Sequence, residues 1–368
     1  MSGRVGRRVL LPVAAAVLVL VAALTVSVLA EWWPAAGPKS PIARVIGQGL
    51  VGSVAFGRGH RHVEPPPPPR EHLVRWHGPV EGIFFHPLVL DPHRAFTNDP
   101  LGQGFQDYFV SAYEFRRILD QLWRNGWTLV DAHAAAAGHV RVPPGRKPLV
   151  LSEDDVNYYA YFNGRGLASR LVLDGNGDVR AEYTDGTGSH LTTNDLVPLV
   201  DAEVARHPEF SADGAKGVLA LTGFEGLFGE HDLTDPAARD RVRALVARLR
   251  ATGWSIASHT YGHIDLTLTS TAAVAADTAR WRALSRGLLG PVDMVIYPFG
   301  ARPTAPNQRL LRDAGFPIQF DIDITARRVV EDGVTVMSRR HIDGFAFDNP
   351  TRQAPFFDVA QVRDPARP

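Results

Sequence analysis

The chain has 368 residues, with 39 basic and 39 acidic side chains, so its formal net charge is zero. Its 45% hydrophobic and 21% charged content is typical of a globular protein and argues against a disordered, collagenous or multi-span membrane chain. The lack of a basic excess predicts no nucleic-acid partner. The chain contains no cysteine, which excludes disulfides, thiolate zinc sites, iron–sulfur clusters and cysteine nucleophiles.

The N-terminal segment has the pattern of a membrane-targeting sequence. Residues 1–8 contain three arginines, and residues 9–30 are uncharged. A helix of that length spans roughly 33 Å, which is enough to cross a bilayer core. The pattern predicts a cytoplasmic tail over 1–8, a single transmembrane anchor over 9–30 and an extracytoplasmic domain at the cell membrane. The alternative is a signal sequence cleaved after Ala30, with Val28 at the −3 position, which would release a secreted protein.

Residues 31–77 have the composition of a linker. They are rich in glycine, proline and alanine, and residues 65–69 are five consecutive prolines. Such a run favours an extended polyproline II conformation and acts as a stiff spacer. A proline-rich recognition peptide is the alternative interpretation.

Residues 78–360 are predicted to form one α/β domain, because short apolar segments alternate with amphipathic ones. The predicted strands cover 82–85, 149–152, 218–222, 255–258, 294–297, 318–320 and 335–337. The predicted helices cover 111–125, 194–207, 235–252, 271–288 and 307–314. Repeated alternation of strands and helices predicts a parallel sheet or a (β/α) barrel.

Residues 170–188 interrupt this alternation. Two apolar segments, 171–173 and 179–183, flank the turn sequence D-G-N-G-D at 174–178, which predicts a β-hairpin insertion. The D-x-N-x-D spacing is also found at the start of calcium loops. Val179 stands where such a loop needs glycine, and no glutamate closes the loop, so the turn is the preferred interpretation.

Two predicted strands lead directly into potential metal ligands. The strand at 149–152 is followed by Glu153, Asp154 and Asp155, at the strand end where active sites of parallel α/β proteins form. Helix capping by one of the aspartates is the structural alternative. The strand at 255–258 leads into His259 and His263, which would face one metal ion if the segment were helical. With 14 histidines in the chain, an H-x-x-x-H spacing also arises by chance.

A third strand end carries the sequence Y-P-F-G at 297–300. Proline removes a backbone donor and glycine permits unusual dihedral angles, so a sharp loop is expected there. A simple strand terminator is the alternative.

Taken together and in this order, the three strand ends resemble the polysaccharide deacetylase family with a NodB-type domain, as a divergent, membrane-anchored member. The S-E-D-D segment at 152–155, H-T-Y-G-H at 259–263 and Y-P-F-G at 297–300 correspond to the three motifs of that family. The segment G-I-F-F-H-P-L at 82–88 resembles the opening strand of its exported members, and residues 108–115 and 126–129 resemble the helix and strand that follow. The resemblance covers about residues 80–345.

The resemblance implies a distorted (β/α)7-type barrel that hydrolyses N-acetyl, or less often O-acetyl, groups on a glycan. It also implies a single divalent metal ion, usually zinc, bound by Asp155, His259 and His263. By the same comparison Asp154 would be the general base, and His341, which follows the last predicted strand, would be the general acid.

The predicted substrate-binding residues are aromatic or lie in the third motif. Tyr158 and Phe224 would stack on sugar rings, although core packing is equally consistent with their sequence context. Tyr297, Pro298 and Phe299 would line the site, with a backbone N–H near Phe299 available to a developing oxyanion.

Some positions depart from the family pattern. Glu153 replaces an apolar residue, Val156 replaces a glycine, and Ile296 stands where an arginine often orients the base. Arg302, Arg339 or Arg340 would have to supply that arginine. From the three motifs and the N-terminal segment we still expect a membrane-attached, metal-dependent carbohydrate deacetylase. A weakly active or inactive glycan-binding protein and a metal-dependent amidohydrolase acting on another amide are the alternatives.

Overall fold

The computed structural model describes residues 73–368. The predicted cytoplasmic tail, the predicted anchor at 9–30 and the linker up to residue 72 lie outside these residues. None of the helices within 73–368 combines the length and the apolar character that a bilayer crossing requires.

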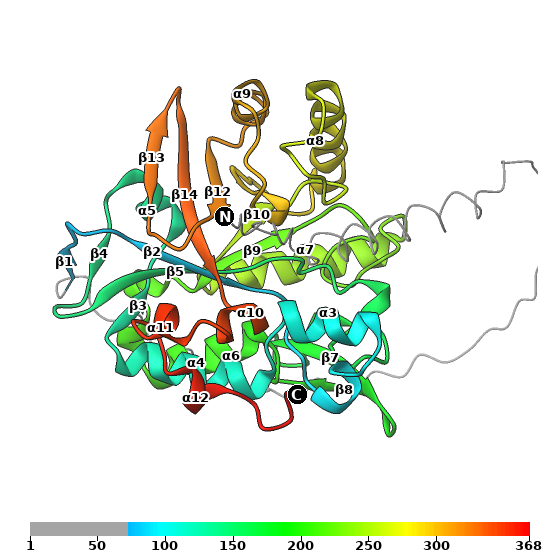
Figure 1. The fold of residues 1–368 in the computed structure, drawn as a ribbon. Coiled ribbons are helices and arrows are strands. Elements are labelled where there is room, and N and C mark those ends of the chain that lie inside the picture. Colours follow the sequence, from blue (N-terminus) through cyan, green and yellow to red (C-terminus); the bar gives the residue numbers. More distant parts are fainter. Residues whose placement is uncertain (1–72) are drawn as a thin grey trace, which may run out of the picture. The chain divides into compact units, whose positions relative to one another are not determined.

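A closed barrel of parallel strands forms the centre of residues 73–368 (Figure 1). Each strand pairs with the next barrel strand along the chain, and β14 closes the ring by pairing with both β12 and β2. The seven strands of the ring are β2 (Glu81–Phe85), β5 (Lys147–Glu153), β9 (Gly217–Leu221), β10 (Trp254–Ser258), β11 (Met294–Ile296), β12 (Ile318–Ile322) and β14 (Val334–His341). Each overlaps a strand predicted from the sequence, so the predicted (β/α)7-type barrel is confirmed.

Two short strands pair with strands of the barrel, and two others pair only with each other. β3 (Trp127–Leu129) pairs parallel to β5, whereas β13 (Arg328–Glu331) pairs antiparallel to β14. A separate pair is formed by β1 (Val74–Arg75) and β4 (Arg141–Val142).

The predicted hairpin insertion is confirmed as β6 (Arg170–Leu173) and β7 (Val179–Asp185), which pair antiparallel. In the turn, Asp174 Oδ1 accepts hydrogen bonds from the backbone N–H groups of Asn176 and Asp178. β8 (Gly188–Thr192) adds a third strand. It was not predicted, because its mostly exposed residues show no alternation of apolar and polar side chains.

Helices cover the outside of the barrel. The longer ones are α3 (Pro100–Tyr108), α4 (Ala112–Arg124), α6 (Leu196–Arg206), α7 (Pro236–Ala251), α8 (Thr271–Ser285) and α9 (Ala305–Asp313). Shorter ones are α2 (Pro92–Ala95), α5 (Ala132–Ala137), α10 (Gly344–Phe347), α11 (Pro350–Gln353) and α12 (Val359–Val362), with 3₁₀ turns at Ala160–Phe162, Pro208–Phe210, Ala212–Gly214 and Pro298–Gly300.

Helix α7 shows why the sequence folds in this way. Asp235 accepts hydrogen bonds from two backbone N–H groups of the first turn, and Pro236 occupies the first helical position, where no N–H is needed. The apolar residues repeat at helical spacing and are buried, for example Val242 and Leu249. Gly253 follows with φ +99°, a conformation that ends the helix and favours glycine.

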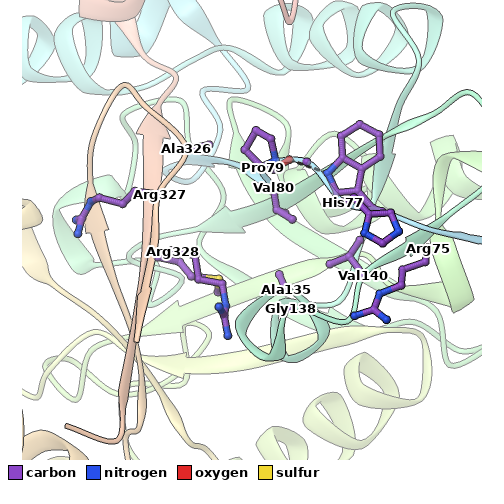
Figure 2. A pocket seen from close by; sticks show the side chains of 13 residues that line it. Arg75, His77, Pro79, Val80, Ala135, Gly138, Val140, Ala326, Arg327 and Arg328 are labelled. Carbon is purple, nitrogen blue, oxygen red and sulfur yellow. Dashed lines mark hydrogen bonds between the residues drawn. The ribbon is translucent and has the colours of Figure 1, made fainter. Parts of the chain in front are cut away.

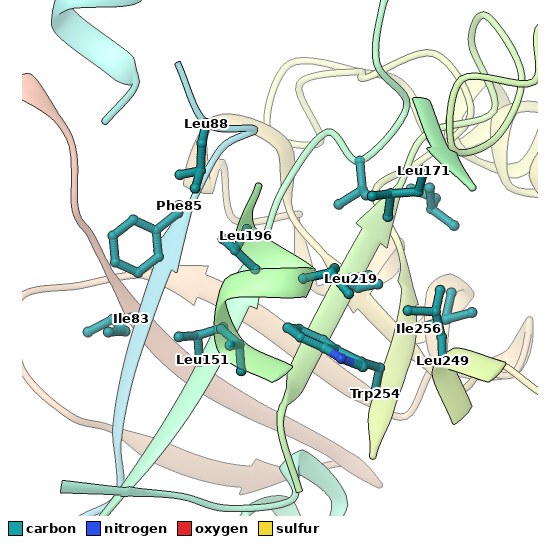
Figure 3. Packing of buried hydrophobic residues seen from close by; sticks show 14 of the residues in the cluster. Ile83, Phe85, Leu88, Leu151, Leu171, Leu196, Leu219, Leu249, Trp254 and Ile256 are labelled. Carbon is teal, nitrogen blue, oxygen red and sulfur yellow. The ribbon is translucent and has the colours of Figure 1, made fainter. Parts of the chain in front are cut away.

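The barrel wall is apolar on both faces, as expected of parallel strands covered by helices. Leu149 and Leu151 of β5 belong to the outer core, which includes side chains of α6 and α7 (Figure 3). Val150 lies in the inner core with Ile296 and other barrel residues. Because successive side chains alternate between faces, Ser152 points into the barrel and Glu153 points outward.

The described fold extends beyond the predicted domain range of 78–360 at both ends. β1 precedes it, and the C-terminal residues pack onto α4. Arg367 donates to both carboxylate oxygens of the fully buried Glu114, each at 2.7 Å. Ser111, the N-cap of α4, donates to Asp364 at 2.6 Å. These ion-pair and hydrogen-bond contacts join segments about 250 residues apart, which no local sequence pattern reveals.

Candidate metal centre

Three potential metal ligands meet at the carboxyl end of the barrel. Asp155 lies just beyond β5, and His259 and His263 follow β10. One ligand atom of each residue lies within 4.8 Å of the others. His263 Nε2 is 3.8 Å from Asp155 Oδ1, and the two imidazole rings are 4.9 Å apart. Two imidazoles and one carboxylate suit zinc and related divalent metals, and they leave coordination positions open.

The two histidines are prepared to act as ligands. Nδ1 of the buried His259 lies 3.0 Å from the carbonyl oxygen of Ile296. The ring therefore donates its Nδ1–H there and keeps the Nε2 lone pair free for a metal. Burial lowers the pKa of His263 to about 4, although Asp155 opposes the shift. At neutral pH His263 is therefore uncharged, the form that binds metal. The residues present thus fit a divalent metal ion.

The segment that carries both histidines is a loop. The H-x-x-x-H spacing would bring the two side chains to one metal ion only in a helix, and this segment is not helical. Thr260 and His263 adopt left-handed conformations, with φ of 63° and 50°. Asp277 of α8 holds the loop, because its carboxylate accepts the N–H groups of Tyr261 (2.7 Å) and Gly262 (2.8 Å). The two imidazoles converge through this turn and not through helical periodicity.

The loop after β5 is held just as firmly. Asp155 has a left-handed φ of 59°, and the Tyr159 hydroxyl donates to its Oδ1 at 2.7 Å. The buried Asn157 joins this loop to the one after β9. Its amide donates to the carbonyls of Thr222 (3.0 Å) and Gly226 (2.6 Å). Strained non-glycine conformations that are over-determined in this way are common at functional sites.

Asp154 lies beside the ligand cluster in a bidentate ion pair. Arg339 Nη1 and Nη2 donate to its two carboxylate oxygens at 2.7 and 3.0 Å, and Nη1 also donates to Ser152 at 2.8 Å. Arg339 is only 1% exposed. Burial raises the pKa of Asp154, but the Arg339 guanidinium outweighs this effect and holds the pKa below its usual range. Asp154 is therefore a carboxylate at neutral pH.

This geometry resolves which arginine could replace the one missing at Ile296. Arg302 instead pairs with Asp321 at 2.6 Å, and Arg340 donates to backbone carbonyls. Arg339 comes from β14, on the far side of β2 from β5, so sequence spacing could not distinguish it from its neighbours.

His86 is a site residue that the sequence interpretation did not single out. It directly follows β2, and its Nδ1 lies 2.9 Å from the Tyr108 carbonyl oxygen. It lies close enough to the cluster that a positive charge on its ring would lower the pKa of both Asp154 and Asp155. Its position at the end of a barrel strand is the signal that could have found it.

His341, the predicted general acid, is the last residue of β14. Its Nδ1 lies 2.8 Å from Asp343 Oδ2, and this hydrogen bond raises the pKa of His341 against the effect of burial. It pairs with Phe84 across the β14–β2 ladder, at the same barrel end as the metal cluster. Among the contacts of residues 73–368, none joins His341 to Asp154 or to the three ligands.

Three of the predicted substrate-binding residues lie in the interior of the protein. Tyr158 and Tyr297 are each only 1% exposed, and Pro298 is also buried. The Tyr158 hydroxyl donates to Asp195 at 2.6 Å, and that of Tyr297 donates to Gln319. All three side chains therefore belong to the core, and the hydroxyl groups of both tyrosines already have buried partners.

The remaining aromatic residues are accessible near the site. Phe299 is 44% exposed and packs edge-on against His263, with ring centroids 4.5 Å apart. Phe224 is half-buried and lies against Tyr159. Tyr161, not predicted, is 40% exposed and stacks on Tyr159 at 5.6 Å.

Glu153 is fully buried on the outer face of the barrel wall. Neither carboxylate oxygen has a hydrogen-bond partner among the described residues. Burial, followed by the nearby Asp195 and Asp154, raises the pKa of Glu153 well above its usual value. The surroundings of Glu153 therefore favour its protonated form, and it takes no part in the metal cluster.

No protein-family model and no curated protein matches the chain. Several solved structures do align with it, among them the following three. The Streptococcus pyogenes deacetylase PplD in complex with acetate has 14% identity and a TM-score of 0.46, over 80% of this chain and 100% of its own. IcaB from Ammonifex degensii has 16% identity and a TM-score of 0.46, over 76% and 98%.

The third structure is a de-N-acetylase from Aggregatibacter actinomycetemcomitans, with 15% identity and a TM-score of 0.44, over 73% of this chain and 96% of its own.

Proposed function

We propose that this protein is a metal-dependent hydrolase that removes acetyl groups from a polysaccharide. The observation that carries the proposal is the position of Asp154: a buried carboxylate, held by Arg339, beside the cluster of Asp155, His259 and His263. The acetylated glycan as substrate is inferred from the three sequence motifs at 152–155, 259–263 and 297–300.

Asp155, His259 and His263 would hold one divalent metal ion, zinc being the preferred candidate. When bound, such an ion supplies Lewis acidity that activates water and polarises an acyl oxygen. The chain itself keeps the ligand set ready: the Ile296 carbonyl fixes the tautomer of His259, and Tyr159 orients the carboxylate of Asp155.

Asp154 would act as the general base. Its lowered pKa keeps it ionised, and the bidentate contact with Arg339 fixes its orientation. It would accept a proton from the water whose oxygen attacks the acetyl carbonyl carbon. The backbone N–H of Phe299 is our candidate donor to the oxyanion that develops on the carbonyl oxygen.

His341 would act as the general acid. Its hydrogen bond to Asp343 raises its pKa and fixes Nδ1, so Nε2 remains available as the proton donor. The proton would go to the leaving sugar nitrogen, or to the sugar oxygen in an O-acetyl substrate, as its bond to the acetyl carbon breaks. Acetate and the deacetylated sugar are the products. Phe299, Phe224 and Tyr161 would contact sugar rings.

We also propose that the protein acts on cell-wall or surface polysaccharide outside the cytoplasmic membrane, anchored through residues 9–30. Release after signal cleavage is the alternative. This part rests on the sequence pattern of residues 1–30 alone.

An inactive glycan-binding protein was suggested by the absence of an arginine at position 296. Arg339 supplies an ion pair to Asp154, so that reason for the alternative is removed. A metal-dependent hydrolase of another amide remains the second candidate, because the same ligands, base and acid suit any accessible acyl group.

The decisive experiment measures acetate release by the full chain from a panel of N- and O-acetylated glycans. Metal content is measured in parallel for the wild type, His259→Ala and His263→Ala, with the exposed His139→Ala as a matched control. We expect about one metal ion per chain in the wild type and in the control, and loss of the metal in both ligand variants. Full metal retention in both variants would refute the site, and metal binding without acetate release from any glycan would refute the deacetylase activity.

A further inference from the structure

A cavity lies away from the metal centre, near the amino end of β2. Its volume is about 300 Å³. It is lined by residues 75–80, which lead into β2, by residues around α5, and by the start of β13. The metal ligands, in contrast, follow the carboxyl ends of β5 and β10. The proposed deacetylation makes no use of this cavity.

The rim of the cavity carries arginine side chains and no acidic ones. Arg75 and Arg328 supply positive charge, His77 lies beside Arg75, and none of the described lining residues is Asp or Glu. Figure 2 shows Arg75 and His77 on one side, with Arg328 opposite them. Arg327 also lines the cavity, but its guanidinium donates a hydrogen bond to the carboxylate of the buried Asp321.

The side chains at the rim keep nitrogen atoms available to a ligand, and one of them, Arg328, is also held in position. Arg328 Nε donates to the Ala136 carbonyl at 2.7 Å, which fixes the side chain while leaving both terminal nitrogens without a hydrogen bond among residues 73–368. Arg75 and His77 likewise make no side-chain hydrogen bond or ion pair within that range. Gly138 lies beside the Arg328 guanidinium. A Cβ added at position 138 would be 3.6 Å from Cζ of Arg328.

The floor of the cavity is apolar. Val80, Val140 and Met337 line it and belong to the inner core or pack against it. The indole of Trp76 also lines the cavity and is fixed by a hydrogen bond from Nε1 to the Pro79 carbonyl at 2.9 Å. A flat apolar surface beside arginine forks suits a ring-shaped ligand that carries an oxyanion.

We propose that this cavity binds an acidic saccharide, with its oxyanion between Arg75 and Arg328 and its ring against the apolar floor and Trp76. The oxyanion is the carboxylate of a uronic acid or the phosphate of a sugar phosphate. The two share the same recognition chemistry, because both accept paired N–H donors from a guanidinium. The site lies outside the deacetylation machinery and stands independently of it.

The test is isothermal titration calorimetry of the full chain with glucuronic acid and with glucose 6-phosphate, against glucose and inorganic phosphate as controls. At least one acidic sugar should bind at least about tenfold more tightly than glucose, because it adds a charge-assisted contact. That sugar should lose about tenfold in affinity in Arg75→Gln and in Arg328→Gln. The exposed Arg116→Gln should bind like the wild type. Raising the salt concentration should weaken binding.

The arms separate the possible outcomes. Tight binding of glucuronic acid alone assigns a carboxylate ligand, and tight binding of glucose 6-phosphate alone assigns a phosphate ligand. Failure of both acidic sugars to bind, or binding that survives both arginine substitutions, would overturn the proposal. Inorganic phosphate binding as tightly as glucose 6-phosphate would overturn the saccharide part.

Arg75 is exposed and unpaired, so its variant tests the site even if Arg328→Gln does not fold. Metal content should be unchanged in all three variants, which separates this test from that of the deacetylase proposal.

Discussion

Glu153, the last residue of β5, and Asp154, which follows it, are buried acids on opposite faces of the barrel wall, and their surroundings differ. Inside the barrel, Asp154 receives two hydrogen bonds from Arg339. On the outer face, between the barrel and α6, the adjacent Glu153 has no hydrogen-bond partner among the described residues and lies near a second acid, Asp195. Both side chains are almost fully buried.

The comparison teaches that burial alone does not decide the charge of an acid. Burial raises the pKa of both residues, and the neighbouring charge then decides the outcome. The Arg339 cation returns Asp154 to the ionised form, whereas Asp195 and Asp154 reinforce the neutral form of Glu153. The inner carboxyl is therefore the better placed of the two to be ionised and to accept a proton.

The largest effect is expected from removing the inner carboxylate. Asp154→Asn should lower the rate of acetate release by about 10²–10⁴-fold, the usual contribution of a general base. The metal-to-protein ratio should stay at the wild-type value, because Asp154 is outside the ligand set. A rate within a fewfold of wild type would show that Asp154 is not the base.

Removing the cation should chiefly reduce stability. Arg339→Met leaves Asp154 buried without its partner and should lower the free energy of unfolding by about 3–5 kcal/mol, measured by denaturant titration. The exposed Arg116→Met serves as the control and should change it by less than about 0.5 kcal/mol. In a double-mutant cycle, Asp154→Asn combined with Arg339→Met should cost less than the sum of the single substitutions. Strict additivity would contradict the ion pair.

The rim of the barrel offers a pH test. Asp343 raises the pKa of His341, so the protonated acid persists to higher pH and activity should fall only as the pH rises through that pKa. In Asp343→Asn the negative charge is lost, so the alkaline limb of kcat should move to lower pH, with about a tenfold lower rate at alkaline pH. Asparagine can still accept the helix-cap hydrogen bond from Ala346. An unchanged limb would exclude His341 as the acid.

The smallest effect, and one of opposite sign, is expected on the outer face. Glu153→Gln removes an ionisable group that has no partner, so the free energy of unfolding at pH 7 should rise by about 1 kcal/mol. The same acid-to-amide change at Asp154 should lower it, because Arg339 would lose its counter-charge. If both substitutions destabilise the protein equally in denaturant titration, the two faces do not differ as described.

Much of the fold was predictable from local patterns. All seven barrel strands were predicted because each is a short apolar segment bounded by a polar loop. The five predicted helices were found because capping residues and helical spacing mark them. β8, β13 and the short helices were missed, since exposed strands and helices of one turn show little periodicity.

The candidate site was predictable where residues follow a strand directly, as Asp154, Asp155 and His259 do. The burial of Tyr158, Tyr297 and Pro298 could not be predicted, because sequence does not reveal on which side of a loop a ring is buried. His86 was given no role, although it lies in the segment 82–88 that resembles the opening strand of the family, and Tyr161 belongs to none of the motifs.

The sequence by itself determined the zero net charge, the absence of cysteine and the order of acids and histidines at strand ends. The lack of cysteine already restricted any metal to histidine and carboxylate ligands. Only the tertiary structure decided that Arg339 is the partner of Asp154, that Glu153 faces away from the site, and that Arg75 and Arg328 share a cavity. These facts depend on which strands become neighbours when the barrel closes, and the charge of each buried acid depends on those neighbours.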